Sequence, residues 1–349
     1  MGNRPGDFIV RDSEPIFSEI SRVRRQWTPT QVRDYIAALP IWNEPVEIRQ
    51  KFGGLTNRTY FAYVNGKPRY AIRVGFDQYR TRQTAVIQCT LAAHALGLGP
   101  RLLYAEPNLS VTDFVEGTGM QLEQMKEPAI MRRIIDRMKL IHGGRREVRE
   151  TISYWWPFDT VRRYMDAMAS GKAATGWKPS PWADRLPRYR EITDRLERGI
   201  GPFLPTFTHN DMAFVNMIIT PSGEIMLIDW DGGGYGHPMF DLGEMLMWAE
   251  ADEPTCVMAL KHYYGSLTAA ELKQRLTEVH SFQTIAALRL VTECLETDLD
   301  PFYHVTPYEF AEGMKEVLPG QTPALIGLAE LLLPRFEAFW DEYQHLFPA

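Results

Sequence analysis

The spacing of apolar residues changes near residue 114, and this change constrains the fold more than any other feature of the chain. Between about residues 45 and 114, short runs rich in Val, Ile, Tyr and Phe are separated by turn residues, which is typical of β-strands. Beyond that point most segments show helical periodicity. We therefore expect an α+β fold with two lobes, a small β-rich lobe over residues 1–113 and a larger helical lobe over residues 114–349.

In the small lobe, Asn65-Gly66 lies between two apolar runs at residues 60–64 and 69–74, so a β-hairpin with a tight turn is predicted there. One helix is predicted to interrupt the strands, from about residue 78 to residue 96. Gly97 follows this helix as its terminating glycine, and Pro100 lies just beyond.

In the large lobe, helical periodicity predicts a series of helices joined by short loops. They are expected near residues 121–142, 159–169, 185–199, 238–250, 254–265, 269–295 and 325–345. The stretch 171–187 contains Gly, Pro and Ser and is predicted to be a loop.

Composition limits the class of protein. The 349 residues are 45% hydrophobic, without an apolar leader or a long uncharged apolar run, so a cytoplasmic, soluble protein is expected. Cys89, Cys256 and Cys294 are far apart and outside any CxxC pair, which predicts free, buried thiols. The net charge of −6 argues against nucleic acid or an anionic membrane as the main partner.

The polar stretch at residues 208–231 indicates a chemistry. Asn216 follows Asp211 by five residues, and Asp229 follows Asn216 by thirteen. This is the spacing of a kinase-type catalytic loop and its metal-binding aspartate. In such a site Asp211 accepts the proton of an acceptor hydroxyl or orients that hydroxyl, while Asn216 and Asp229 hold Mg²⁺ against nucleotide phosphates.

The same stretch has a simpler interpretation, a capped turn followed by a hairpin. Two strand-like segments, residues 216–220 and 224–228, flank Pro221-Ser222-Gly223, which is predicted to form the turn. Asp231 shares a strand face with Asp229 by the period of two, so it is a candidate ligand for a second Mg²⁺. The coincidence of three spaced polar residues with a two-lobed chain favours phosphoryl transfer over a turn alone.

Several motifs follow one another in order over about residues 50–250. They are Phe52-Gly53-Gly54-Leu55-Thr56-Asn57, Tyr70-Ala71-Ile72-Arg73, Gly97-Leu98-Gly99-Pro100, His209-Asn210-Asp211 with Asn216, Ile228-Asp229-Trp230-Asp231 and Phe240-Asp241-Leu242-Gly243. Together they resemble the choline/ethanolamine kinase branch of the aminoglycoside phosphotransferase-like kinases. The resemblance implies a two-lobed protein-kinase-like fold, ATP as co-substrate and Mg²⁺ as cofactor.

The resemblance also implies roles for single residues. Arg73 would reach the α- and β-phosphates in place of the lysine of protein kinases. His209 would be structural within the catalytic loop, and Asp241 would brace the backbone of that loop besides capping a helix. The nucleotide base would meet the backbone of the hinge, which comprises Thr112, Asp113 and Phe114 and extends to Val115.

The glycine turn can be interpreted without the resemblance. Gly53 and Gly54 between two strands let the backbone approach a ligand closely, and Thr56 and Asn57 add small hydrogen-bonding groups. This turn is therefore predicted to cover nucleotide phosphates. An ordinary hairpin turn is the simpler explanation.

One departure from the family pattern concerns charge. Kinases of this type carry a glutamate on the small-lobe helix that pairs with the strand cation, but residues 78–99 contain no acidic residue. Gln83 and Gln88 are the nearest polar substitutes, and a neutral amide can hydrogen-bond Arg73 without neutralising it. A non-catalytic, nucleotide-binding pseudokinase is therefore an alternative.

An ammonium-bearing acceptor would need aromatic faces and a carboxylate. The predicted acceptor site consists of Trp155, Tyr235, Glu244, Trp248, Glu250 and Glu293, with Trp156, Phe302, Tyr303 and Tyr308 as further aromatic candidates. Packing in the core is the simpler explanation for any one aromatic residue. Where choline kinases resemble this segment, they place a glutamate for the cation a turn after the DxG motif, but the register here falls on Trp248, between Glu244 and Glu250.

The sequence thus predicts an ATP-dependent kinase acting on a hydroxyl of a small, amine-bearing acceptor similar to choline or ethanolamine. A variant of this kinase hypothesis has an aminoglycoside, another small alcohol or a sugar as the acceptor. The alternative to an enzyme is the non-catalytic pseudokinase. The expected partners are a small-molecule acceptor and a nucleotide, without nucleic acid and without membrane insertion. The acceptor's identity, ATP versus GTP and the oligomeric state stay open.

Overall fold

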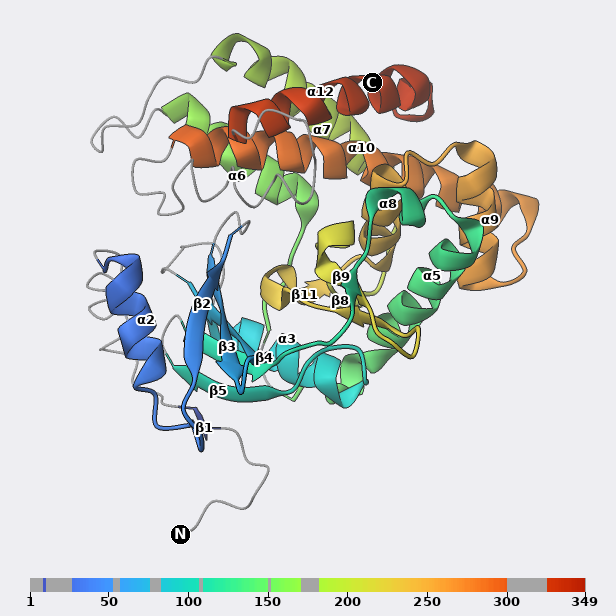
Figure 1. The fold of residues 1–349 in the computed structure, drawn as a ribbon. Helices are drawn as coiled ribbons and strands as arrows, with labels where there is room; N and C mark the ends of the chain where they lie inside the picture. Colours follow the sequence, from blue (N-terminus) through green and yellow to red (C-terminus); the bar gives the residue numbers. More distant parts are fainter. Residues whose placement is uncertain are drawn as a thin grey trace.

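The computed structural model describes residues 9–10, 27–52, 57–75, 83–106, 109–149, 152–170, 182–299 and 325–348. A β-sheet with one helix on its outer side forms one part of the molecule, and a group of helices forms the other (Figure 1). Short strands lie between the two parts, where the polar stretch of the sequence is found. The predicted order of a β-rich lobe followed by a helical lobe is therefore observed.

Six strands form the sheet of the small lobe, in the order β1-β5-β6-β4-β3-β2. They are β1 (Ile9–Val10), β2 (Glu47–Lys51), β3 (Arg58–Val64), β4 (Lys67–Val74), β5 (Leu102–Glu106) and β6 (Leu109–Asp113). The hairpin of β3 and β4 turns at Asn65 and Gly66, whose φ values are 51° and 77°. The predicted turn is therefore confirmed. It forms at these two residues because Asn and Gly tolerate the left-handed conformation best.

Two helices pack against this sheet region. Helix α2 (Pro29–Ala37) was not predicted and begins with a capping box between Thr28 and Gln31. Helix α3 (Gln83–Ala95) matches the second part of the predicted helix, and residues 78–82 lie outside the described residues. Its end is set by Gly97 at φ 69°, after which the N–H of Leu98 donates to the carbonyl of Ala93 at 2.9 Å.

Helix α3 also joins the two lobes. Its buried residues Cys89, Ala92 and Ala93 belong to the apolar core of the large lobe, whereas the strands and α2 enclose a separate core. The sheet ends at Asp113 with β6. The division of the chain into lobes at residues 113 and 114 stays a prediction, with α3 contributing to both sides.

The large lobe contains the predicted helices with two corrections. They are α4 (Leu122–Met125), α5 (Pro128–Gly143), α6 (Pro157–Ser170), α7 (Leu186–Arg198), α8 (Pro238–Trp248), α9 (Glu253–Tyr264), α10 (Ala269–Leu299) and α12 (Leu325–Tyr343). The predicted single helix at residues 121–142 is two helices, because Pro128 starts the second one. The predicted loop at residues 171–187 ends earlier, since α7 begins at Leu186, and residues 171–181 lie outside the described residues.

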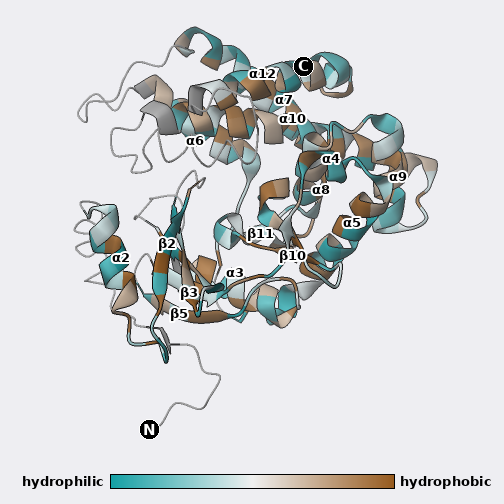
Figure 2. Ribbon diagram, in the orientation of Figure 1, coloured by the Kyte–Doolittle hydropathy of each residue, from teal (hydrophilic) through white to brown (hydrophobic). Residues whose placement is uncertain are grey.

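These helices bury one apolar face each. In α5 the buried residues Met131, Ile134, Ile135 and Met138 recur at intervals of three and four, which places them on one side of the helix. Figure 2 shows hydrophobic and hydrophilic residues side by side along this helix and its neighbours. The hydrophobic effect across this core holds the lobe together.

Five short strands lie between the sheet and the helices. They are β7 (Thr118–Gly119), β8 (Thr206–Thr208), β9 (Met217–Ile219), β10 (Ile225–Leu227) and β11 (Gly234–Gly236). The predicted hairpin is observed as β9 and β10, except that Asn216 lies in a turn of 3₁₀ helix (Phe214–Asn216) just before β9. The pairing of β8 with β11 was not predicted, and it brings the residues before Asp211 beside those after Asp229.

The predicted free thiols are confirmed. Cys89, Cys256 and Cys294 are unpaired and buried. Burial raises the pKa of Cys89 and of Cys256 to about 12, so both thiols are protonated at neutral pH. Within the described ranges, no helix combines the length and the apolar character needed to span a membrane.

Helix α8 depends on His237 at its N-cap, where Nδ1 accepts a hydrogen bond from the N–H of Met239 at 3.0 Å. Burial lowers the pKa of His237 to about 3, while the unfolded chain protonates at its ordinary value near 6.5. Acid therefore favours the unfolded state. Between pH 6.5 and pH 5 this histidine should lower the free energy of unfolding by about 2 kcal/mol.

Replacing His237 by Asn removes the titrating group but keeps an N-cap acceptor. Chemical denaturation at both pH values should show a smaller loss of stability in H237N than in the wild type. The exposed His345 provides the matched control, as H345N. An unchanged pH dependence in H237N would contradict this prediction.

Candidate active site

The backbone of the polar stretch is held in an unusual conformation. Asn210 and Asp229 have φ values of 62° and 63°, in the left-handed region that few residues other than glycine adopt. The N–H of Ile228 donates to the carbonyl of Asn216 at 2.9 Å, which joins the two halves of the stretch. Local strain of this kind concentrates at functional sites.

His209 and Asn210 connect the two halves through their side chains. Nε2 of His209 lies 3.0 Å from the carbonyl oxygen of Ile228, and the amide of Asn210 donates to the carbonyl of Gly232 at 2.8 Å. A side chain at Gly232 would approach the His209 carbonyl to 3.1 Å, so the glycine permits this close packing. His209 is fully buried, which supports the structural role predicted for it.

Asp241, on helix α8, holds the backbone of the loop that precedes Asp211. Its Oδ2 accepts from the N–H of His209 at 2.9 Å, and its Oδ1 accepts from the N–H of Asn210 at 2.7 Å. Nε2 of His142, on α5, lies 3.1 Å from the same Oδ2. His142 was missed by the sequence analysis, and its place among the buried residues of α5 was the available signal.

The amide of Asn216 is oriented by Asp211. Its two N–H groups are used, one by Oδ2 of Asp211 at 2.7 Å and one by the backbone carbonyl of Asp211 at 3.0 Å. The amide therefore presents its oxygen to a ligand. Asp229 follows Ile228, whose N–H binds the Asn216 carbonyl, and 41% of the Asp229 side chain is exposed.

These two donors fit Mg²⁺. Among the described residues, no group of three or more His, Cys, Asp or Glu side chains could hold a metal ion by itself. One amide oxygen and one carboxylate suit a hard cation that completes its coordination with phosphate and water oxygens. The metal roles of Asn216 and Asp229 stay predictions that this donor set supports.

Arg289, on α10, is a further site residue that the sequence analysis missed. Its side chain is 8% exposed, and its guanidinium lies 3.3 Å from Asp211, 2.6 Å from Glu244 and 2.9 Å from Glu293. Burial raises the pKa of Asp211, and the charge of Arg289 opposes this rise. The available signal was the single arginine in the run 279–295, which contains no lysine.

Arg73 connects the small lobe with the large one. Its Nη1 lies 3.0 Å from Oδ1 of Asp229, and its two terminal nitrogens form a bidentate ion pair with Asp231. Asn57 also donates to Asp231, at 3.3 Å. Arg73 thus has two acidic partners although α3 carries no glutamate. The second-metal role of Asp231 stays a prediction, and its oxygens face Arg73 here.

The predicted nucleotide contacts are only partly described. The N–H of Asp113 donates to the carbonyl of Arg101 at 3.0 Å, and the N–H of Phe114 donates to that of Arg69 at 2.9 Å. Thr112 lies within β6. The N–H groups of Asp113 and Phe114 are therefore already used. A nucleotide base at this hinge would bind backbone carbonyl groups or residues after Phe114. The glycine-turn residues Gly53, Gly54 and Thr56 lie outside the described residues.

The residues predicted for the acceptor fall into separate contact groups. Glu244 and Glu293 belong to the cluster around Arg289. Glu250 pairs with Arg335 and also with Lys126, whose Nζ is 3.1 Å away. The Arg335 guanidinium lies 5.8 Å from the ring centroid of Trp248. The Arg145 guanidinium lies 5.7 Å from the ring centroid of Tyr235. Phe302, Tyr303 and Tyr308 lie outside the described residues.

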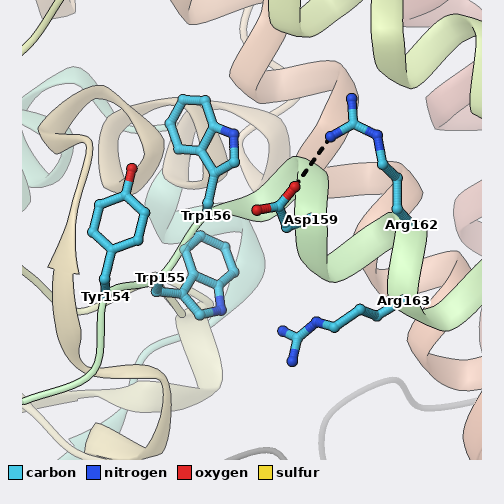
Figure 3. Close-up of a pocket in the computed structure, with 6 residues that line it drawn as sticks. All are labelled: Tyr154, Trp155, Trp156, Asp159, Arg162 and Arg163. Atoms are coloured by element: carbon cyan, nitrogen blue, oxygen red, sulfur yellow. Dashed lines mark hydrogen bonds and ion pairs between the residues drawn. The ribbon is translucent and has the colours of Figure 1, made fainter.

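Trp155 lines a cavity of about 380 Å³ beside α6 (Figure 3). The aromatic side chains Tyr154, Trp155 and Trp156 lie on one side of it, and Asp159, Arg162 and Arg163 project from α6 on the other. The Asp159 carboxylate accepts from Arg162 at 3.2 Å. The lining includes neither Asp211, Asn216 nor Asp229, so this cavity is separate from the candidate catalytic residues.

Asp241→Asn tests the bracing of the loop. An amide has one acceptor oxygen, so its NH₂ group would face one of the two backbone N–H groups that Asp241 now satisfies. A buried donor without a partner costs about 1–3 kcal/mol, and the lost charge adds to this. We expect D241N to lower the free energy of unfolding, measured by chemical denaturation, by roughly 2–4 kcal/mol.

The matched control is Asp252→Asn, because Asp252 caps α9 at the surface by accepting from the N–H of Thr255. Asn is an equally good N-cap residue, so D252N should change stability by less than about 0.5 kcal/mol. Equal effects of the two substitutions would show that Asp241 does not brace the loop.

Comparison with known proteins places this geometry in a family. The model of the choline/ethanolamine kinase family matches residues 48–275. Mouse ethanolamine kinase 2 is 24% identical over 234 residues, which cover 64% of this chain. The aligned part spans about half, 55%, of the mouse protein.

Solved structures of similar fold cover both lobes. A choline/ethanolamine kinase family protein from Mesorhizobium loti superposes with a TM-score of 0.61 at 17% identity, over 91% of this chain and 97% of that one. LicA, the choline kinase of Streptococcus pneumoniae, was solved in complex with AMP. It superposes with a TM-score of 0.60 at 16% identity, over 91% of this chain and 98% of LicA. These likenesses confirm the two-lobed, kinase-like α+β fold. Because the family model covers well over half of its residues, this chain belongs to the choline/ethanolamine kinase family.

Proposed function

We propose that this chain transfers the γ-phosphoryl group of ATP to a hydroxyl of a small molecule. One observation carries the proposal: Asp211 and Asn216 are bonded to each other, and the loop that bears them is bonded to the segment that bears Asp229. Base and metal donors therefore converge where the two lobes meet. The AMP in the LicA structure supports an adenine nucleotide as the donor.

The proposed reaction balances as a direct transfer. The acceptor oxygen bonds to the γ-phosphorus, the bond from that phosphorus to the β-phosphate oxygen breaks, and Asp211 takes the hydroxyl proton. Arg289 favours the ionised form of Asp211, because a nearby positive charge stabilises a carboxylate. Mg²⁺ held by Asn216 and Asp229 would neutralise phosphate charge, and Arg73 would exchange its acidic partners for phosphate oxygens.

One feature supports catalysis over nucleotide binding alone. The pseudokinase alternative was based on the missing glutamate of α3, and Arg73 has Asp229 and Asp231 as partners instead. Because free, buried cysteines suit a reducing compartment, we propose the cytoplasm as the location of the protein. Family membership favours an amine-bearing acceptor.

Asp211→Asn tests the role of the base. General-base catalysis contributes about 10²–10⁴ in rate, so we expect kcat for ADP formation to fall at least a hundredfold while Mg-ATP still raises the melting temperature. The matched control is Asp166→Asn, because Asp166 is 66% exposed and pairs with Arg190 on α7. This control should keep wild-type turnover.

The acceptor panel contains amino alcohols, aminoglycosides, sugars and neutral alcohols. If none of them stimulates ADP formation while Mg-ATP still stabilises the protein, the enzyme proposal fails. If an acceptor is turned over equally by D211N, Asp211 is not the base.

A further inference from the structure

The cation beside Asp211 comes from a distant part of the chain. The loop itself carries no lysine or arginine between Asp211 and Asn216. Among the described residues, Arg289 is the only arginine or lysine that contacts the Asp211 carboxylate, with its Nη2 at 3.3 Å from Oδ1. Helix α10 therefore supplies a charge that the loop does not contain.

Each oxygen of the Asp211 carboxylate has a partner in the protein. Oδ1 faces Arg289, and Oδ2 accepts from the amide of Asn216 at 2.7 Å. The last side-chain torsion of an aspartate is broad, so a carboxylate with one partner can turn, whereas partners on both oxygens fix its plane. A carboxylate offers about four acceptor positions, so the Asp211 oxygens can still accept the hydrogen of a hydroxyl.

Glu244 in turn holds Arg289. Its Oε1 accepts from Nη2 of Arg289 at 2.6 Å, and its Oε2 accepts from the N–H of Met212 at 2.8 Å. Because Met212 directly follows Asp211, these contacts form a closed ring. Glu293, four residues after Arg289 on α10, lies 2.9 Å from Nη1. The guanidinium is thus held at both terminal nitrogens.

Close packing of α8 against α10 brings this ring together. A side chain at Gly243 would come within 2.5 Å of Cβ of Phe282, so the glycine lets the two helices approach. Glu244 is the next residue on α8. Arg289 lies about two helical turns after Phe282, on the same face of α10. The place of Arg289 therefore depends on the packing of two helix backbones as well as on its ion pairs.

Stability alone does not account for an arginine at this place. The side chain is 8% exposed, and within the described part of the chain its Nε has no hydrogen-bond partner. A buried donor without a partner is unfavourable, and apolar residues of similar volume often replace a buried ion pair without loss of stability. A role in the site explains why an arginine is present despite the unpaired Nε.

We infer that Arg289 is a positioning residue: together with Asn216 it fixes the plane of the Asp211 carboxylate, and Glu244 holds Arg289 for this purpose. The inference rests on the proposed transfer to a hydroxyl beside Asp211. Arg289 acts through Asp211 and not on the nucleotide, whose phosphates are expected at Arg73. Loss of Arg289 should therefore lower kcat far more than it changes the KM of Mg-ATP.

A double-mutant cycle on kcat tests whether Arg289 acts through Asp211. ADP formation by the full chain is measured with the acceptor of the panel that gives the highest turnover. We expect Arg289→Met to lower kcat by about tenfold or more and to leave the KM of Mg-ATP within about threefold, because a misplaced base slows the transfer without weakening nucleotide binding. In the D211N background, R289M should lower kcat by less than about threefold, because the carboxylate that Arg289 positions is gone.

The matched control is Arg275→Met. Arg275 also lies on α10 and pairs with Glu278 at 2.6 Å, away from Asp211. R275M should keep kcat within about twofold in both backgrounds, because distant sites act independently. If R289M lowers kcat by the same factor with and without the Asp211 carboxylate, Arg289 acts independently of the base and the inference is overturned.

Crystal structures of the variants give a readout that does not depend on turnover. In R289M we expect the Asp211 carboxylate to rotate away from Asn216 or to occupy more than one conformer, and in R275M we expect it unchanged. A single, unrotated Asp211 carboxylate in R289M contradicts the positioning role. If no acceptor is phosphorylated, the proposed transfer fails, while these structures still decide whether Arg289 positions Asp211.

A second variant covers the case in which R289M lacks a cooperative unfolding transition. Glu244→Gln combined with R289M removes the buried carboxylate that would lose its cation and keeps an acceptor oxygen for the N–H of Met212. This double variant should show the same loss of kcat and the same dependence on Asp211. Wild-type kcat in the folded double variant overturns the inference.

Discussion

The geometry of the site depends on the buried carboxylate of Asp241. It accepts hydrogen bonds from two consecutive backbone N–H groups, those of His209 and Asn210, and thereby holds Asn210 in a left-handed conformation. Helix α8 supplies this carboxylate one turn from its N-terminus, where a negative charge is also stabilised by the helix dipole. The position of Asp211, the next residue in the chain, follows from this bracing.

The same helix determines the charge around Asp211. Glu244 lies three residues after Asp241, on the same side of α8, and it binds both Met212 and Arg289. One helix therefore fixes the backbone of the loop that bears Asp211 and positions a cation beside the Asp211 carboxylate. Substitutions in α8 should therefore change both the stability of the loop and the charge around Asp211, because the same helix supplies the groups for both.

The contact between the lobes is electrostatic at the site. Arg73 of the small lobe pairs with Asp229 and Asp231 of the large lobe, and nucleotide phosphates would compete for the same guanidinium. Burial raises the pKa of Asp231 to about 6, against the opposing charge of Arg73. If Arg73 binds phosphate as predicted, these ion pairs would have to rearrange, and nucleotide affinity would then be the difference between two sets of charged contacts.

The sequence by itself determined what depends on local chemistry. The Asn65-Gly66 turn, the end of α3 at Gly97, most helix ranges and the spacing of Asp211, Asn216 and Asp229 could all be read from neighbouring residues. Only the tertiary structure decided which charges meet: Arg289 is 78 residues from Asp211, and Arg73 is 158 residues from Asp231. Such pairs follow from helix packing and lobe contact, which leave no periodic pattern in the chain.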